Sequence, residues 1–180
     1  MTKIHYINYF STEKNFGKAI NDAISLLPTN DWVCVRDLDT MFLRPDTGNQ
    51  IQEIVERYKN KFQLIGCVTN RLRLRHQLYQ YKFNDESDVR EHIVIANELY
   101  ETYKTKVMPF DSVVAGCFML FPVKVWKNCK FVENTPRFDF IFTDCVKSKG
   151  GKVGLAKGVY QFHLYRMWSE NPIQEIAHLI

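Results

Sequence analysis

Several signals of common protein classes are missing from this sequence of 180 residues. It has no run of about 18 apolar residues, so no membrane-spanning helix is expected. Its five cysteines contain no Cys-x-x-Cys pair, which argues against a zinc site or a disulfide framework and favours buried, reduced thiols. There is no P-loop and no Gly-x-Gly-x-x-Gly motif, which disfavours Walker-type and Rossmann nucleotide sites.

The length and composition of the chain predict one globular domain over residues 1–180. With 46% hydrophobic residues the chain can bury a core. The N-terminus leads into a strand-like run and not into the apolar segment of a secretory signal, so we expect a cytoplasmic protein. A net charge of +4 slightly favours an anionic substrate and does not call for nucleic acid.

Hydrophobic periodicity predicts alternating strands and helices. Strands are expected at 3–9, 32–36 and 62–68, with amphipathic helices between them, the second capped by Asn49. This order predicts an α/β domain with a mostly parallel central sheet flanked by helices. Downstream we expect a strand at 112–121, helices at 123–128 and 139–149, and two short strands near 152–155 and 158–163. Residues 70–110 are rich in charge and predict an excursion that contains a helix.

The most informative motif is a pair of aspartates, Asp37 and Asp39, which follows the apolar residues 32–35 after Arg36. In an extended chain, residues two positions apart point to the same side. Two carboxylates that close repel each other unless a cation or a proton lies between them. Mg²⁺ and Mn²⁺ prefer oxygen ligands and also hold phosphates. The motif therefore predicts metal-assisted chemistry on a phosphorylated substrate, although aspartates at a strand end also form ordinary turns.

The C-terminal third holds further candidates. Asp139 opens a predicted helix, where a carboxylate serves either as a cap or as a catalytic group. Asp144 is rotated by roughly 140° from it around the helix, so the two acids are not expected to share one role. His163 suits a metal site or a hydrogen-bonded place in the core. Arg166 suits a phosphate or a surface acid.

Taken together, these pieces resemble the metal-dependent glycosyltransferases of the GT-A fold, closest to glycosyltransferase family 2. Residues 16–21 are similar to the family's glycine-lysine-alanine helix beside the nucleotide, and residues 32–39 are similar to its strand and Asp-x-Asp motif. Residues 115–120 with Trp126 resemble its acceptor-site segment. Residues 138–139 stand where the family has Glu-Asp, and His163 stands where a late histidine completes the metal site.

The resemblance implies transfer of a sugar from a nucleotide-diphosphate donor to the hydroxyl of a glycan or another acceptor, with inversion. It implies that Asp37, Asp39 and His163 hold Mn²⁺ or Mg²⁺, and that Asp139 is the base, with Asp144 in reserve. The candidates for contact with the donor are Asn15, Lys18, Asn21, Arg36, Asp37, Asn70, Arg71 and Arg166. The candidates for contact with the acceptor are Gly116, Cys117 and Trp126. For the residues at the first helix and for Asn70 and Arg71, an ordinary surface role is equally open.

The sequence departs from the family in two places. Only 36 residues precede Asp37, which is short for the family's nucleotide-binding half. Either part of the donor pocket is missing or compressed, or a partner chain or a second copy of this chain completes the site. Phe138 replaces the usual glutamate.

Two other functions stay open at this point. One is a catalytically silent binding module of the same fold. The other is a haloacid-dehalogenase-like phosphatase, in which Asp37 would be the nucleophile. That class also needs a downstream acidic motif, which the sequence lacks.

Overall fold

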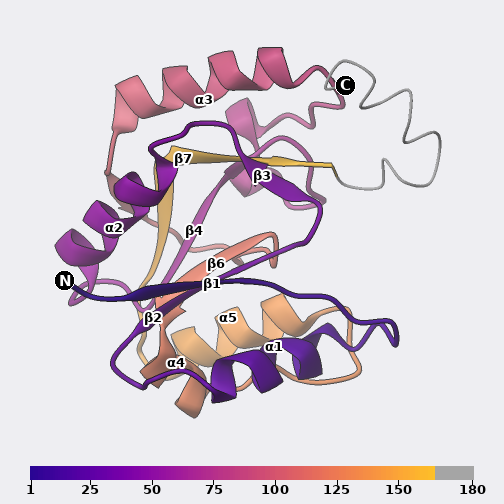
Figure 1. The fold of residues 1–180 in the computed structure, drawn as a ribbon, viewed down its shortest axis with the longest axis vertical. Helices are drawn as coiled ribbons and strands as arrows, with labels where there is room; N and C mark the ends of the chain where they lie inside the picture. Colours follow the sequence, from indigo (N-terminus) through magenta and orange to yellow (C-terminus); the bar gives the residue numbers. More distant parts are fainter. Residues whose placement is uncertain (165–180) are drawn as a thin grey trace.

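A seven-stranded sheet forms the middle layer of the protein, whose computed structural model describes residues 1–164 (Figure 1). The strand order is β1-β2-β6-β4-β7-β3, and β5 also pairs with β7. The strands are β1 (Ile4–Asn8), β2 (Trp32–Arg36), β3 (Thr40–Phe42), β4 (Leu64–Thr69), β5 (Val107–Pro109), β6 (Phe118–Pro122) and β7 (Val153–His163). The helices are α1 (Phe16–Ser25), α2 (Thr47–Tyr58), α3 (Val89–Tyr103), α4 (Val123–Asn128) and α5 (Phe138–Ser148), with the short 3₁₀ helices η1 (Arg75–Gln77) and η2 (Tyr79–Tyr81).

The directions of the strands confirm the predicted α/β class. β1 is parallel to β2, and β4 is parallel to β7, while β6 lies between these two pairs and runs antiparallel to both neighbours. The short strands β3 and β5 are antiparallel to β7. Most of the strands, β1, β2, β4 and β7, therefore share one direction. Their carboxyl ends meet at one edge of the sheet, which is where ligands bind in open α/β folds.

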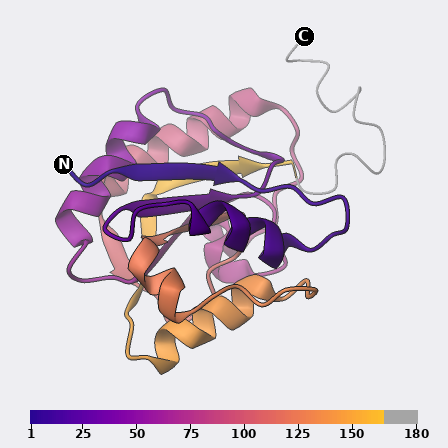
Figure 2. The same ribbon diagram turned by 60° about the horizontal axis from the view of Figure 1, so that its bottom comes forward.

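Helices cover both faces of the sheet (Figures 1 and 2). On β2, Val33 and Val35 pack into the core cluster that contains α1, α4 and α5, whereas Trp32 and Cys34 pack into the cluster that contains α2. Successive side chains of a strand point to opposite faces, so strands covered on both faces appear as continuous apolar runs in the sequence. This is why the buried strands could be predicted from short apolar segments.

The helix within residues 70–110 belongs to the layer that covers the sheet on the side of α2. Ala96 and Leu99 of α3 pack against Val68 of β4 and Tyr160 of β7. β5, which follows α3, pairs with β7. None of the helices within residues 1–164 combines the length and the apolar character that crossing a bilayer needs.

Two predicted boundaries near helices and loops are wrong. α2 begins at Thr47 with Asp46 at the N-cap position, so Asn49 lies inside the first turn. The helix starts early because the turn at Pro45 leads directly into it. The strand expected at 112–121 begins only at Phe118.

β6 begins later in the chain than predicted because side chains bind the backbone of the residues before it. The backbone N–H groups of Val114 and Ala115 donate to the side chains of Thr143 and Gln77, at 3.3 and 2.8 Å. These backbone groups are thus bound by side chains and not by a neighbouring strand.

The two short strands expected near 152–155 and 158–163 are one continuous strand, β7. Its register against β4 shifts between Cys67 and Val68, and the irregularity lets the strand continue past Lys157. Gly158 lies at this point because a Cβ atom there would be 2.0 Å from the Lys104 carbonyl oxygen. The glycine that resembled a break between strands is thus a site of close backbone approach.

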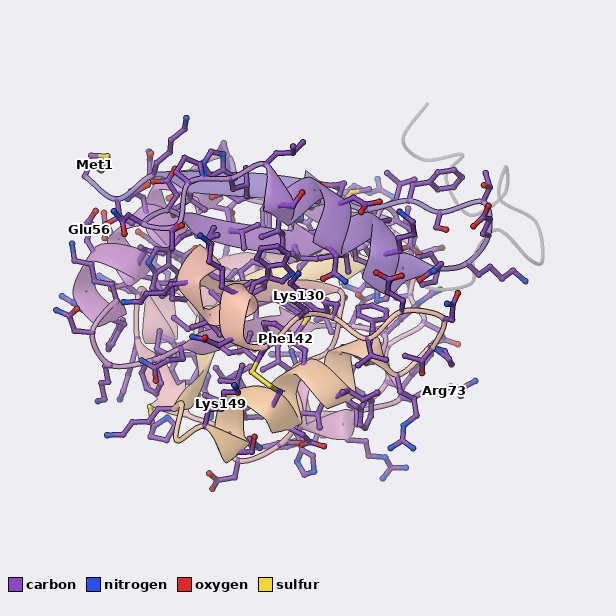
Figure 3. All side chains as sticks on the ribbon, turned by 90° about the horizontal axis from the view of Figure 1, so that it is seen from below. Met1, Glu56, Arg73, Lys130, Phe142 and Lys149 are labelled. Carbon is purple, nitrogen blue, oxygen red and sulfur yellow. A yellow bond between two sulfur atoms is a disulfide. The ribbon has the colours of Figure 1, made fainter. Side chains whose placement is uncertain are left out.

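One pair of cysteines corrects the expectation of reduced thiols. Cys129, which follows α4, and Cys145, on α5, form a disulfide, visible near Phe142 in Figure 3. Cys34, Cys67 and Cys117 are free and buried, as expected for reduced thiols. The sequence gives no sign of the disulfide because 16 residues separate its cysteines, and only the packing of α4 beside α5 brings them together.

Removing this disulfide is expected to lower the free energy of unfolding by about 3 kcal/mol, the value that chain entropy gives for a loop of about 15 residues. Urea denaturation of the wild type with and without reductant would measure the change. The double variant Cys129→Ala/Cys145→Ala should show the lower midpoint in both conditions. Equal midpoints for all samples would contradict the prediction.

Candidate functional site

The Asp-x-Asp motif forms the turn between β2 and β3. The Thr40 hydroxyl donates to the Asp37 carbonyl oxygen at 2.7 Å, and Arg36 Nη2 donates to the Thr40 carbonyl oxygen at 3.0 Å. The N–H of Leu164 donates to the Asp39 carbonyl oxygen at 2.9 Å, which ties the turn to the end of β7. The backbone of the turn is therefore held in place on both sides, and both carboxylates are half-buried.

His163, the last residue of β7, is held by its neighbours Asn70 and Arg71. The Asn70 carboxamide accepts from the His163 N–H at 2.8 Å and donates to the His163 carbonyl oxygen at 3.2 Å. The ring atom Nδ1 lies 3.0 Å from the Arg71 carbonyl oxygen. Because a carbonyl oxygen can only accept, Nδ1 carries a proton. Histidines that bind metals commonly donate their second ring N–H in this way.

The other ring nitrogen of His163 faces the two aspartates. Nε2 lies 3.3 Å from Asp39 Oδ1 and 3.5 Å from Asp37 Oδ2. One ligand atom from each of the three residues falls within 4.8 Å of the others, so this triad could hold a metal ion. Carboxylates suit both Mg²⁺ and Mn²⁺, and the fixed imidazole adds a nitrogen ligand. The donor set and the proton on Nδ1 both fit such an ion.

The electrostatics of the triad favour a positive charge between the side chains. Burial raises the pKa of Asp37 to about 7, and the charges of Asp39 and Asp139 add to the rise while His163 opposes it. Burial lowers the pKa of His163, but Asp39 and Asp37 outweigh this and raise it overall. The site therefore retains protons more strongly than these groups do in water.

These shifts predict a pH-dependent response to cations. Without metal, folded Asp37 binds a proton up to about pH 7, whereas the unfolded chain releases it near 3.8, so stability should fall as pH rises between these values. The raised pKa of His163 acts in the same direction, but only above its ordinary value of 6.5. A cation needs both groups deprotonated, so the rise in melting temperature caused by Mn²⁺ should be larger at about pH 8 than at about pH 5. Thermal melts with Mn²⁺ and with EDTA test this, and a shift independent of pH would contradict it.

Sequence reasoning missed one residue at this site, Tyr9. It follows β1, whose carboxyl end lies beside that of β2, and its hydroxyl donates to Asp37 Oδ1. The ring is buried and packs edge-on against Phe16 and Phe138, with centroids 5.4 and 5.7 Å away. The position of Tyr9 at the end of a predicted strand was the one available signal in the sequence. The carboxyl ends of adjacent parallel strands share one edge of the sheet, so a residue after β1 lies near the residues after β2.

Asp139, at the start of α5, lies near the triad. Its Oδ2 accepts from the Gly116 N–H and its Oδ1 from the Phe140 N–H, both at 2.9 Å. Burial raises the pKa of Asp139, although these backbone hydrogen bonds lower it. Its charge also contributes to the raised pKa of Asp37. Asp144 lies on the same helix but is exposed, and it is not part of the triad.

Gly116 and Cys117 are buried beside these acids. A Cβ atom on Gly116 would lie 2.8 Å from the Phe138 ring and 3.3 Å from the Tyr9 hydroxyl. Any larger residue at position 116 would therefore collide with Phe138. Burial raises the pKa of the Cys117 thiol, and among the nearby charges are Asp37 and Asp139. The structure thus brings together the expected metal ligands, the expected base and two of the expected acceptor residues.

Asn15 and Lys18 lie at the start of α1. The side chain of Asn15 accepts from the Lys18 N–H at 3.2 Å, which caps the helix, and it also bonds to Asn134. The Lys18 ammonium is exposed and pairs with Asp22 at 2.5 Å. Asn15 and Lys18 help to line a surface hollow of about 280 Å³. Contact of this hollow with a donor stays a prediction.

Asn21 and Trp126 bind each other within the fold. The Trp126 indole N–H donates to Asn21 Oδ1 at 2.8 Å, and Asn21 also bonds to both backbone groups of Phe131. Trp126 is part of the buried core. Nearby, a Cβ atom on Gly17 would lie 2.2 Å from the Val132 carbonyl oxygen. The motif that resembles a nucleotide-binding helix thus also fastens α1 to residues 131–134.

Three of the remaining donor candidates lie close to triad residues: Arg36 directly precedes Asp37 in the chain, and Asn70 and Arg71 hold His163. Arg36 stacks on the Phe42 ring, 4.0 Å from its centroid, and its Nε has no hydrogen-bond partner within the described residues. Asn70 and Arg71 are buried, and besides holding His163 they both bond to the Asn84 carbonyl oxygen. Arg166 lies outside the described residues.

Comparison with solved structures shows a similar fold in UDP-glucose pyrophosphorylase from Acinetobacter baumanii. The TM-score is 0.50 and the sequence identity 14%, over 90% of this chain and 55% of that chain. The chain thus spans about half the length of that protein. At this identity the likeness shows the fold alone, an α/β domain with a mostly parallel central sheet flanked by helices. No protein-family model and no curated protein matches the chain.

Proposed function

We propose that this protein is a metal-dependent glycosyltransferase that moves a sugar from a nucleotide-diphosphate donor to an acceptor hydroxyl, with inversion. The observation that carries the proposal is the convergence of Asp37, Asp39 and His163 within 4.8 Å, with Asp139 nearby. The triad lies where β2 and β7 end, at the edge of the sheet where α/β folds bind ligands. The similar fold belongs to a protein named for UDP-glucose, which supports a nucleotide sugar as the donor.

The triad would act on the leaving group. A Mn²⁺ or Mg²⁺ ion held by its three side chains would supply positive charge against the departing nucleoside diphosphate. His163 is oriented for this by the proton that Nδ1 shares with the Arg71 carbonyl oxygen. Tyr9 holds one oxygen of Asp37 and so fixes the direction of the other.

Asp139 would take the proton of the acceptor hydroxyl. Both of its oxygens are anchored by backbone N–H groups, so the carboxylate cannot rotate away. Its raised pKa makes it a better base than an aspartate in water. With one base and one leaving-group site, the reaction would be a single displacement, which inverts the configuration at the sugar carbon.

The direct test is to incubate the protein with UDP-glucose, GDP-mannose or dTDP-glucose and Mn²⁺, and to identify the products. Release of a nucleoside diphosphate that stops in EDTA supports the proposal, since water can replace the acceptor. Formation of a nucleoside triphosphate when pyrophosphate is added would point to nucleotidyl transfer, the reaction suggested by the name of the similar structure.

Two further outcomes would favour a different function. Binding of a nucleotide without any turnover would indicate a silent binding module. Hydrolysis of p-nitrophenyl phosphate in place of the nucleotide sugars would indicate a phosphatase.

A further inference from the structure

A second pocket, of about 750 Å³, lies between η2, the C-terminal half of α3 and the segment that follows β5. Its volume is within the range of about 300–1,000 Å³ found for small-molecule sites. Among the described residues, none that lines it belongs to the metal triad. Lys157 lines the pocket, and His163 lies six residues further along β7. The pocket is therefore a different place from the candidate metal centre.

Three tyrosines give the pocket aromatic walls with polar edges. Tyr79 and Tyr81 come from η2, and Tyr103 ends α3. The Tyr79 hydroxyl donates to Glu98 at 2.8 Å and accepts from Gln80 at 3.0 Å. Tyr81 is 62% exposed, so its ring is available to a ligand. Tyrosine offers an apolar ring face and a hydroxyl tip together, which suits a ligand whose own surface alternates between C–H and O–H groups.

The charges around the pocket argue against a phosphate-bearing ligand. Glu98 and Asp111 line it together with Lys157, whose Nζ lies 5.5 Å from the centroid of the Tyr103 ring. His76 also lines the pocket, but two carboxylates against one ammonium and one imidazole still leave no excess of positive charge for a nucleoside diphosphate. They do offer both acceptors and donors, which neutral hydroxyl groups can use at the same time.

The backbone at the rim is held in an uncommon conformation. Gln80 and Tyr81 both have positive φ, 51° and 61°, in the left-handed region that disfavours side chains other than glycine. Such strain persists only where the surroundings fix it, and it gathers at ligand sites. Tyr81, which has this conformation, lines the pocket and keeps most of its surface exposed.

We propose that this pocket binds a neutral saccharide, with a sugar ring stacked on Tyr81 and hydroxyl groups bound by Glu98 and Lys157. The proposal is independent of the metal centre and of the proposed transfer reaction. It assigns the pocket a ligand class that matches its aromatic walls, its balanced polar groups and its volume.

The test is calorimetric titration of maltose, cellobiose and diacetylchitobiose into the protein. We expect at least one of them to bind. Tyr81→Ala should weaken that binding about tenfold, which corresponds to about 1.4 kcal/mol of lost contact, whereas Tyr81→Phe should keep it. Asp39→Ala should bind the saccharide as the wild type does, so that failure of the transfer proposal is distinguished from failure of this one.

A pair of glycine variants separates binding from stability. Tyr81→Gly should raise the melting temperature, because glycine adopts positive φ freely, and should lose the saccharide. Lys14→Gly is the matched control, since Lys14 also has positive φ, 58°, but does not line the pocket. It should raise the melting temperature and keep the saccharide. Binding of none of the three sugars, or equal binding by wild type and Tyr81→Ala, would overturn the proposal.

Discussion

Replacement of Asp39 by alanine is expected to abolish the Mn²⁺-dependent binding of nucleotides. Asp39 supplies one of the three ligand atoms of the triad, and its carboxylate is the closer of the two to His163 Nε2. Changes in the groups that merely orient metal ligands cost about 10–100-fold in affinity, so loss of a ligand should cost more than about 100-fold. Titration of UDP, GDP, CMP and dTDP in Mn²⁺ and in EDTA measures the effect.

The matched control is Glu53→Ala, which removes an exposed carboxylate from α2, away from the triad. It changes the net charge by the same amount and should leave nucleotide binding unchanged. The Asp39→Ala protein should remain folded in EDTA, because loss of a charge beside Asp37 relieves repulsion and the backbone bond to Leu164 is kept. Nucleotide binding that still depends on Mn²⁺ in Asp39→Ala would rule out the triad as the metal site.

Replacement of Asp139 by asparagine is expected to keep nucleotide binding and to lower the transfer rate about 100-fold or more, the usual contribution of a general base. Asparagine cannot take a proton from the acceptor. Its amide oxygen can still accept from one of the two N–H groups that Asp139 binds, so we expect a modest loss of stability of about 1 kcal/mol. Product formation and nucleotide binding should be measured together, well below the melting temperature.

Asp144→Asn on the same helix decides between the two candidate bases. Asp144 is exposed, and its variant should transfer at the wild-type rate. A normal rate in Asp139→Asn together with a slow rate in Asp144→Asn would reverse the assignment. If both variants were slow, the fold of α5 would be examined by circular dichroism before any role was assigned.

The sequence predicted the features that depend on local pattern. Buried strands such as residues 32–36 form apolar runs, and helices such as α4 were bounded correctly because periodicity is a local property. Features that depend on distant pairing were not predicted. The antiparallel insertion of β6 between β2 and β4 and the disulfide of Cys129 with Cys145 require knowledge of which elements pack together.

In the candidate site, too, the residues in local patterns were predicted and those that depend on distant pairing were not. Asp37 and Asp39 were predicted because they adjoin a strand, Asp139 because it opens a predicted helix, and His163 because histidine binds metals; the family resemblance then implied their roles. Tyr9 and the clamping role of Asn70 were not found, because a tyrosine after a strand and a buried asparagine have no distinctive spacing. Their roles follow from the pairing of β1 with β2 and from the meeting of β4 with β7.

The pairing of Thr40 with His163 has a consequence for biosynthesis. Two ligands of the triad leave the ribosome early, and the third leaves only after β7 has been made. A nascent chain that ends before residue 163 therefore carries the acidic turn without its histidine. Capture of a cation by all three side chains requires β3 to pair with β7. Such capture would therefore report that translation has passed β7 and that these two strands have paired.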